Sequence, residues 1–267
     1  MLTLNHLGNL GRLANQMFQY ASLKGIAKQR GYDFMVPPKE VFGRKDPMVK
    51  GDLLNLYDVF KIEENNKVGL SHNPVLQERT HEFDNELFIN CPDNVDLFGY
   101  YQTHKYFEHI EDEIRNDFNF DPELQFDCRQ CYNENFGDSE VIALHIRRGD
   151  YVSNPNHPVQ PITYYKKALK EMPSNLPVIV FTDDAEWCKE QKIFAPDSFF
   201  ISEGNASDAD LCLMTMCNYH IIANSSFSWW GAWLGQSEKI IAPKNWFGGE
   251  CVNKSVKDME FGNWSWL

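Results

Sequence analysis

The pattern of apolar and polar residues is clearest in the second half of the chain. Val141–Ile146 is apolar throughout except for His145, as is typical of a parallel strand buried on both faces. Four more short apolar runs follow, separated by segments with helical periodicity or helix-start signals. The predicted strands are Val141–Ile146, Val178–Thr182, Phe199–Ser202, His220–Ala223 and Lys239–Ala242, and the predicted helices are Thr163–Met172, Ala185–Lys192, Ser207–Cys217 and Ser226–Leu234. This alternation predicts a doubly wound α/β domain.

The pattern of the N-terminal residues predicts a strand, a glycine-containing loop and a helix. An extended run begins at Leu2, and an apolar stripe follows at helical spacing up to Gly31. Lys24 and Lys28 lie on this stripe, so their ammonium groups are expected to reach past it to water. Residues 39–135 carry a weaker pattern, with a helix expected near 106–118. The polar stretch 133–139 is the predicted boundary between domains 1–138 and 139–267.

Charge disfavours one class of ligand. The chain has 25 Lys and Arg against 38 Asp and Glu, which gives a net charge of −13. Proteins that bind duplex nucleic acid or an anionic membrane surface carry basic faces, and no run of Lys and Arg occurs here. A small anion needs only a few cations at one point, and Arg147 with Arg148 forms the evident pair.

The N-terminal residues lack the cationic start and apolar stretch of a secretory signal, and no segment approaches the ~20 apolar residues of a membrane helix. We therefore expect a cytoplasmic protein without stable membrane insertion. The seven cysteines are an odd number at low density, so reduced thiols are expected.

The most distinctive polar residues follow the predicted strands, where ligands of such sheets bind. His145 to Tyr151 reads HIRRGDY and closes the first strand of the second half. Two arginines leaving a buried strand require anions or carboxylates, and a guanidinium can hold two phosphate oxygens at once. Arg148 and Asp150 could instead form a structural ion pair, and one arginine is expected to do so.

Three other junctions carry polar groups. Asp183 and Asp184 follow the second strand and could bind a nucleoside or cap the next helix. Asn15 and Gln16 open the first helix and could contact a sugar. A serine-rich helix start offers N–H groups to phosphate, although serine N-capping alone would also explain it; it comprises Asn224, Ser225, Ser226 and Phe227.

Other motifs are absent or weak. No GxGxxG follows the first strand and no GxxxxGK[ST] occurs, which disfavours a dinucleotide oxidoreductase and a P-loop NTPase. Asp208-Ala209-Asp210 matches the DxD pattern of metal-dependent sugar transferases, but Ser207 with Asp210 also resembles a capping box. Cys128 and Cys131 form a lone CxxC without the second pair that a zinc site needs. No metal site is therefore expected.

Taken together, the segments GRLANQMFQYA, HIRRGDY, FTDDAEWC, NSSFSWWGAWL and IIAPKNWF resemble glycosyltransferase family eleven, the α-1,2-fucosyltransferases. They occur in order across nearly the whole chain, with residues of the middle third poorly matched. Ala14 stands where many relatives have glycine.

The resemblance implies a GT-B fold of two facing Rossmann-like domains, with GDP-β-L-fucose as co-substrate, inversion at the anomeric carbon, no cofactor and no metal. It implies a galactose-terminated glycan as acceptor and transfer to its 2-hydroxyl. By position, Arg147 would hold the β-phosphate as the catalytic cation, beside His145, and Arg148 and Asp150 would support it. Further donor-binding residues would be Asn15, Gln16, Asp183, Asp184, Asn224, Ser225, Ser226 and Phe227.

Two alternatives remain open at this point. One is a fucosyltransferase that makes another linkage, including protein O-fucosylation. The other is a non-catalytic module that binds a glycan or a nucleotide.

Overall fold

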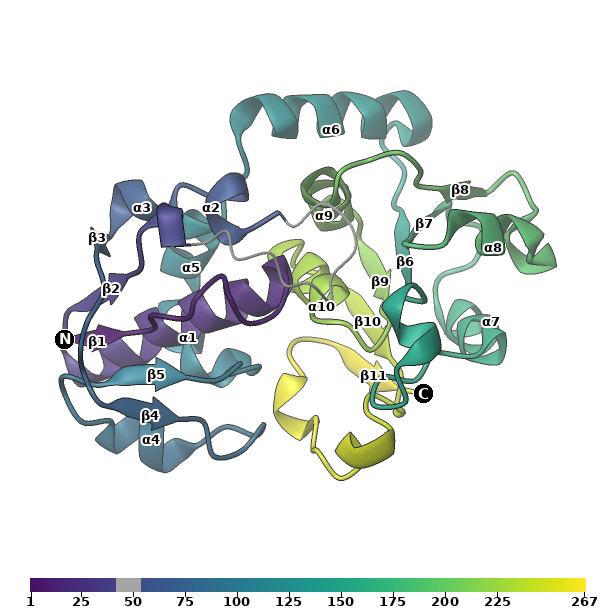
Figure 1. The fold of residues 1–267 in the computed structure, drawn as a ribbon. Helices are drawn as coiled ribbons and strands as arrows, with labels where there is room; N and C mark the ends of the chain where they lie inside the picture. Colours follow the sequence, from purple (N-terminus) through teal and green to yellow (C-terminus); the bar gives the residue numbers. More distant parts are fainter. Residues whose placement is uncertain (42–53) are drawn as a thin grey trace. The chain divides into compact units, whose positions relative to one another are not determined.

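The computed structural model describes residues 1–41 and 54–267, which divide into two compact units (Figure 1). Unit 1 contains Met1–Asp121 and Ser255–Met259, and unit 2 contains Pro122–Lys254 and Glu260–Leu267. The expected division at 138/139 differs from this in two segments. Residues 122–138 belong to unit 2 because helix α6 (Pro122–Phe136) packs on helix α9 (Ser207–Thr215), where the Cys128 Sγ donates to the Ala209 carbonyl.

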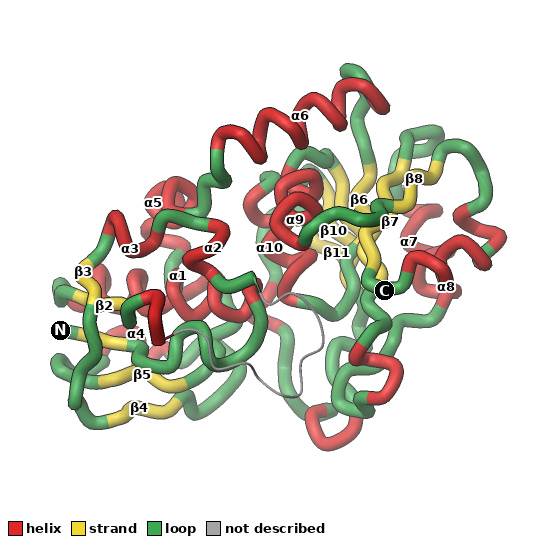
Figure 2. The backbone as a smooth tube through the Cα atoms, turned by 45° about the horizontal axis from the view of Figure 1, so that its top comes forward, coloured by secondary structure: helices red, strands yellow, loops and turns green. Residues whose placement is uncertain are grey.

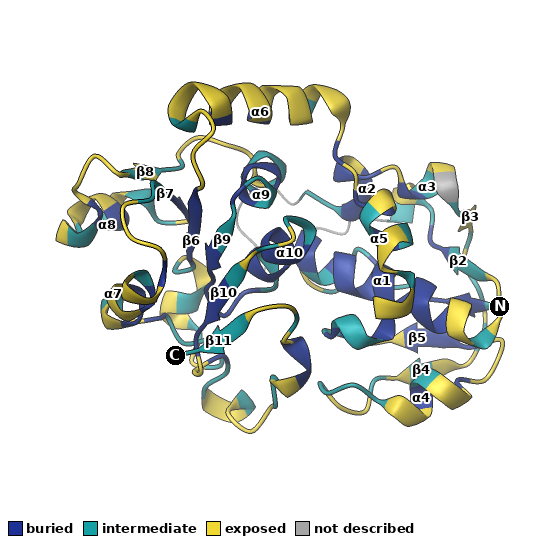
Figure 3. Cartoon of the chain, turned by 180° about the vertical axis from the view of Figure 1, so that it is seen from behind, coloured by how far each residue is buried: buried dark blue, intermediate teal, exposed yellow. Residues whose placement is uncertain are grey.

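Unit 1 is built on a parallel sheet with the strand order β3-β2-β1-β5-β4. Helix α1 (Leu13–Arg30) follows β1 and ends at Gly31 as predicted, and Gly31 adopts the left-handed conformation. Along α1 an almost unbroken run of residues is buried, as the dark blue ribbon of Figure 3 shows. The strands are β1 (Leu2–Thr3), β2 (Phe34–Val36), β3 (Lys67–Val68), β4 (Val75–Gln77) and β5 (Asp96–Phe98), and the other α-helices are α2 (Leu56–Val59), α3 (Ile62–Asn65), α4 (Asn85–Asn90) and α5 (Glu111–Asp117).

The expectation for Lys24 was wrong. Its side chain is buried rather than extended to water, because the Asp117 carboxylate accepts from Lys24 Nζ at 2.6 Å and from the Tyr20 hydroxyl at 2.7 Å. Lys28 is half exposed and pairs with Glu113.

Unit 2 is built on a parallel sheet of order β11-β10-β9-β6-β7-β8. All five strands predicted in this half are present, and the structure adds β11. Helices α7 and α8 cover one face of the sheet, and α9 and α10 cover the other (Figures 1 and 2). The strands are β6 (Ile142–Ile146), β7 (Val178–Thr182), β8 (Phe199–Ile201), β9 (Tyr219–Ile221), β10 (Lys239–Ala242) and β11 (Trp264–Trp266), and the remaining α-helices are α7 (Ile162–Glu171), α8 (Ala185–Glu190) and α10 (Ser226–Leu234).

The order of the strands in the unit 2 sheet indicates where a ligand can bind. The chain builds β6, β7 and β8 outward in one direction, then returns to place β9 and β10 on the other side of β6. The switch point of the sheet therefore lies beside β6, whose carboxyl end leads directly into Arg147. In open α/β sheets, ligands bind beyond the carboxyl ends of the strands at such a point.

Candidate functional site

The site in unit 2 begins where β6 and β7 end together. All five residues of β6 are buried, and the parallel register pairs Ile146 with Thr182. The residues that follow each strand must therefore emerge side by side at the same edge. This register brings Arg147 and Arg148 of one strand to Asp183 and Asp184 of the next.

Arg147 is held by two carboxylates. Its Nη1 lies 2.8 Å from Asp183 Oδ2, its Nη2 pairs with Asp150 Oδ1, and its guanidinium carbon lies 5.5 Å from the centre of the Tyr151 ring. The arginine side chain is only 17% exposed, whereas that of Asp150 is 49% exposed. Asp150 is therefore the partner that solvent or a ligand can reach most easily.

Arg148 has different surroundings. Its Nε donates to Asp184 Oδ2 at 2.9 Å, and its guanidinium lies 4.1 Å from the centre of the Trp187 ring. Asp184 also caps helix α8 by accepting from the Trp187 N–H. Arg148 thus fastens the loop after β6 to the start of α8.

Gly149 allows these two strand ends to approach closely. A Cβ atom at this position would lie 2.6 Å from Asp183 Oδ2, which is closer than real Cβ contacts. The Asp183 carboxylate meanwhile accepts from the Arg148 backbone N–H at 2.8 Å. Any side chain at residue 149 would displace the carboxylate that orients Arg147.

His145 is the penultimate residue of strand β6, and its side chain is buried. It is 6% exposed, its Nδ1 lies 2.8 Å from Ser228 Oγ, and its ring lies 5.7 Å from that of Phe227. Burial, with a smaller contribution from Arg147, lowers the pKa of His145 well below its ordinary value, although Asp183 opposes the shift. The imidazole is therefore neutral near pH 7 and can serve as a hydrogen-bonding group, not as a cation.

Helix α10 begins beside His145 with the serine-rich segment. The Ser225 hydroxyl caps the helix by accepting from the Phe227 N–H at 3.3 Å. Asn224 is 1% exposed, and its Nδ2 donates to the carbonyls of Pro158 and Trp246, so it joins three loops. Ser225 and Asn224 thus stabilise the start of helix α10. The N–H groups and the positive end of the helix dipole at this start favour an anion.

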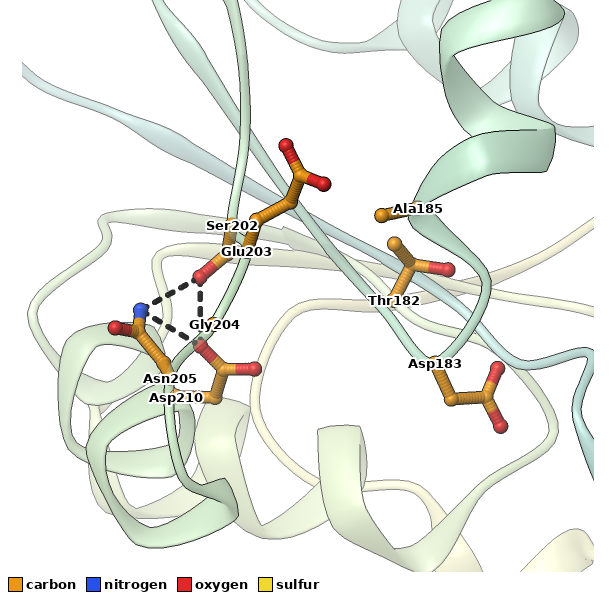
Figure 4. A pocket seen from close by; sticks show the side chains of 8 residues that line it. All are labelled: Thr182, Asp183, Ala185, Ser202, Glu203, Gly204, Asn205 and Asp210. Atoms are coloured by element: carbon orange, nitrogen blue, oxygen red, sulfur yellow. Dashed lines mark hydrogen bonds between the residues drawn. The ribbon is translucent and has the colours of Figure 1, made fainter.

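A pocket of about 200 Å³ opens beside the β7 and β8 ends (Figure 4). Its walls come from the β7–α8 junction, from the loop after β8 and from the first turn of α9. The lining residues are Thr182, Asp183, Ala185, Ser202, Glu203, Gly204, Asn205 and Asp210. Asp183 therefore belongs both to this pocket and to the arginine cluster, and the two features are continuous.

Asp210 is a partly buried acid in the lining of this pocket. Its Oδ1 accepts from Ser202 Oγ at 2.6 Å and from Asn205 Nδ2 at 3.3 Å (Figure 4). Burial raises the pKa of Asp210, and the two hydrogen bonds oppose that shift. The capping box expected from Ser207 and Asp210 was wrong, because the N-cap of α9 is Ala206, whose methyl group cannot accept a hydrogen bond. The Asp210 carboxylate instead accepts from Ser202 and Asn205.

In unit 1, the two polar residues that open α1 have different surroundings. Gln16 is 3% exposed, and its amide is engaged on both sides, donating to the Gly11 carbonyl and accepting from the Leu56 N–H. Gln16 thus fastens the loop before α1 to helix α2. Asn15 is partly exposed, and its Oδ1 accepts from Gln102 Nε2 at 2.7 Å.

Within residues 1–41 and 54–267, no three His, Cys, Asp or Glu side chains form a group that could hold a metal ion. Asp208 binds its own helix at the Ala209 N–H, while Asp210 belongs to the pocket. Cys128 is buried and Cys131 is exposed, and both are free thiols. None of the helices in those residues has the length and apolar character needed to span a membrane.

A sequence model of glycosyl transferase family 11 matches residues 2–267. The chain belongs to this family. A family 11 assignment confirms the resemblance of the five motifs and makes the protein a glycosyltransferase.

Two relatives of this chain have names that describe different sugar transfers. It is 34% identical to the α-1,2-colitosyltransferase of Escherichia coli, over 91% of this chain and 92% of that protein. It is 26% identical to the galactoside α-(1,2)-fucosyltransferase 2 of Bos taurus, over 90% of this chain and 70% of that protein. Both names describe α-1,2 transfer, but the sugars differ.

The architecture also matches solved structures. A crystal structure of NodZ α-1,6-fucosyltransferase co-crystallized with GDP aligns with a TM-score of 0.57 and 17% identity, over 91% of this chain and 94% of that one. At this identity, the likeness shows the fold alone. It confirms the predicted GT-B class, with a parallel α/β sheet in each unit.

Sequence reasoning identified the arginine cluster but missed the interior of the pocket. Ser202, Asn205 and Asp210 come from two segments, and no pattern along the chain links the end of β8 to the first turn of α9. The acidic spacing Asp208–Asp210 was visible, but it suggested a metal or a cap. In the folded chain, the hydrogen bonds of Ser202 and Asn205 hold Asp210 in the pocket lining.

Proposed function

We propose that this protein is an inverting glycosyltransferase that moves L-fucose from GDP-β-L-fucose to the 2-hydroxyl of a galactoside. In this reaction the hydroxyl oxygen bonds to the anomeric carbon as the bond from that carbon to the β-phosphate oxygen breaks. The electron pair stays on GDP, and the hydroxyl proton is released to water. Negative charge therefore grows on the diphosphate while the sugar ring becomes positive.

The observation that carries the proposal is the clustering of Arg147 with the start of helix α10 at the switch point of the unit 2 sheet. A guanidinium can hold two phosphate oxygens, and helix N–H groups favour an anion. Charge that develops during bond breaking is best stabilised by such preorganised groups. We assign Arg147 to the β-phosphate, and Ser226 and Phe227 at the helix start to the diphosphate.

The pocket beside β7 and β8 suits the base of the nucleotide. Guanine presents a ring N–H and an exocyclic amino group side by side, and a carboxylate can accept from both. Asp210 provides a carboxylate that is oriented by Ser202 and Asn205 and lies in the pocket. Asp183 and Asp184 are instead bound to the two arginines. We therefore assign guanine recognition to Asp210 and orientation of the arginines to Asp183 and Asp184.

Colitose is a second candidate for the sugar that the GDP donor carries. The relative named as a colitosyltransferase is 34% identical over nearly the full length of both chains. Colitose is fucose without its 3-hydroxyl group, so an enzyme that hydrogen-bonds this hydroxyl would favour fucose. Competition between the two GDP-sugars for one acceptor separates these candidates.

The test is incubation of the protein with GDP-fucose and a panel of galactosides, followed by NMR of the product. The proposal requires GDP release and an α-1,2 linkage to galactose. Another linkage would support the alternative transferase, and binding of GDP without turnover would support a non-catalytic module.

We further propose that no metal takes part, because Arg147 and the α10 start supply the positive charge. Transfer should then continue in the presence of a chelator. Loss of activity with chelator and recovery with Mn²⁺ would contradict this and would favour a metal at Asp208 and Asp210.

A further inference from the structure

Arg147 contacts an aromatic ring as well as its two carboxylates. Its guanidinium carbon lies 5.5 Å from the centre of the Tyr151 ring, within the ~6 Å over which the face of an aromatic ring attracts a cation. Asp150 and Asp183 neutralise positive charge and compete with a phosphate for the guanidinium, whereas the tyrosine ring carries no net charge. The Tyr151 ring can therefore hold Arg147 and leave its charge available to an anion.

Several contacts within unit 2 fix the Tyr151 ring. Tyr151 lies in a short 3₁₀ helix at Asp150–Ser153, and its carbonyl accepts from the Asn154 N–H at 3.1 Å. The ring stacks on the imidazole of His157, with ring centres 5.1 Å apart and an angle of 22° between the planes. His157 in turn contacts Phe247, with ring centres 5.8 Å apart. The Tyr151 ring is therefore one member of a packed aromatic group.

The hydroxyl group of Tyr151 joins the arginine loop to the start of helix α10. It donates to the Asn224 carbonyl at 3.0 Å, and Asn224 immediately precedes Ser225, the N-cap of this helix. Asn224 is 1% exposed, and its Nδ2 is held by two loop carbonyls, so this anchor is itself fixed. One side chain therefore contacts Arg147 through its ring and the start of α10 through its hydroxyl.

We propose that Tyr151 is a positioning residue, which holds the Arg147 guanidinium at a fixed place relative to the N–H groups of α10. This proposal rests on the proposed function, in which both groups stabilise the charge that grows on the departing diphosphate. Asp150 is the carboxylate that a phosphate could replace, so Asp183 and the Tyr151 ring would continue to orient Arg147 in the donor complex. Tyr151 thus acts through Arg147 and not on the substrate.

The decisive variants are Tyr151→Leu and Tyr151→Phe. Leucine removes both the ring and the hydroxyl, so kcat for fucosyl transfer should fall about tenfold, because a displaced cation stabilises the transition state less. Phenylalanine keeps the ring beside Arg147 but loses the hydrogen bond to Asn224, so kcat should fall only about threefold. GDP affinity should change less than kcat in both variants, because the position of the cation matters most for charge that develops during bond breaking.

Tyr219 provides the matched control within unit 2. It is the first residue of β9 and pairs with Ile142 at the start of β6, so it lies at the opposite end of the strands from the arginine cluster. Its hydroxyl donates to Glu140 and Glu238. Tyr219→Leu and Tyr219→Phe make the same chemical changes and should leave kcat near the wild-type value. Tryptophan fluorescence follows both GDP binding and thermal unfolding, since all seven tryptophans lie in unit 2.

A double-mutant cycle with Arg147 separates positioning from a purely structural role. In an Arg147→Ala background, assayed at high enzyme concentration, Tyr151→Leu should cause little further loss of kcat, because the side chain that it positions is absent. Full additivity of the two changes, an equal loss in Tyr219→Leu, or wild-type kcat in Tyr151→Leu would overturn the proposal. If Tyr151→Leu does not fold, the same criteria apply to Tyr151→Phe. Failure of the wild type to transfer fucose would instead overturn the proposed function, so the two failures are distinguishable.

Discussion

At the residue scale, the arginine cluster carries more negative than positive charge before any ligand binds. Arg147 and Arg148 face Asp150, Asp183 and Asp184. In the proposed donor complex, a diphosphate bound to Arg147 would replace one of the carboxylates around it. Asp150, with half of its side chain exposed, is the partner that can most easily turn away, whereas Asp183 is also fixed by the Arg148 N–H. Asp183 thus holds the Arg147 guanidinium in position, and the Asp150 carboxylate is the partner that a phosphate could replace.

A residue-scale prediction concerns the base pocket. Asp210→Asn replaces an acceptor by an amide that meets the guanine donors with N–H groups, so GDP affinity should fall about 100-fold, which corresponds to ~2.7 kcal/mol. Asp208→Asn is the matched control, since Asp208 lies on the same helix, accepts from the Ala209 N–H and does not line the described pocket. A tryptophan fluorescence titration with GDP measures both. Equal losses in the two variants would contradict the assignment.

A second prediction tests the close contact at Gly149. Gly149→Ala should displace the Asp183 carboxylate, and with it Arg147, because the added Cβ would lie 2.6 Å from Asp183 Oδ2. Transfer activity should fall more than 10-fold while unit 2 keeps its fold. Steady-state kinetics with a tryptophan fluorescence melt as the folding control provide the measurement. A fully active variant would show that Asp183 does not orient Arg147.

At the element scale, the sequence predicts unit 2 better than unit 1 for a physical reason. Strands β6 and β7 are five-residue runs buried on both faces, so they read as continuous apolar segments. The strands of unit 1 are two or three residues long, too short to show a period. Helix α6 was missed because only Cys128 and Tyr132 are buried along its 15 residues, which leaves no apolar stripe to detect.

The element-scale prediction concerns the buried pair that joins α1 to α5. Asp117→Ala would leave Lys24 Nζ with the more exposed Glu113 carboxylate at 3.4 Å, and loss of the buried partner should destabilise by about 3 kcal/mol. Lys28→Ala removes the exposed pair with Glu113 and should cost under ~1 kcal/mol. Hydrogen exchange of the α1 amides measures the effect in unit 1, which has no tryptophan. Similar effects of the two substitutions would contradict the role given to the buried pair.

At the scale of the whole molecule, two buried histidines make the stability of unit 2 depend on pH. Burial lowers the pKa of His220 to about 4, and it also lowers the pKa of His145. Between pH ~4 and ~6.5 the unfolded chain binds protons that the folded unit cannot, so the free energy of unfolding falls as the pH falls. Each histidine contributes up to ~1.4 kcal/mol per pH unit to this decrease in the free energy of unfolding.

Denaturant titrations followed by tryptophan fluorescence measure this dependence in unit 2. His220→Gln should unfold more easily at neutral pH, because His220 bonds to Ser237 and Met214, but should show a shallower pH dependence than the wild type. Parallel curves for the two proteins would contradict the proposed proton uptake.

The central claim is that Arg147 stabilises the charge on departing GDP, while Arg148 holds the loop. The most direct measurement is the rate of fucosyl transfer from GDP-fucose to a galactoside by Arg147→Ala and Arg148→Ala, each with its GDP affinity. The account predicts that Arg147→Ala loses transfer by about 100-fold or more, with a much smaller loss of GDP affinity, and that Arg148→Ala retains measurable turnover. Near-native turnover by Arg147→Ala would contradict it.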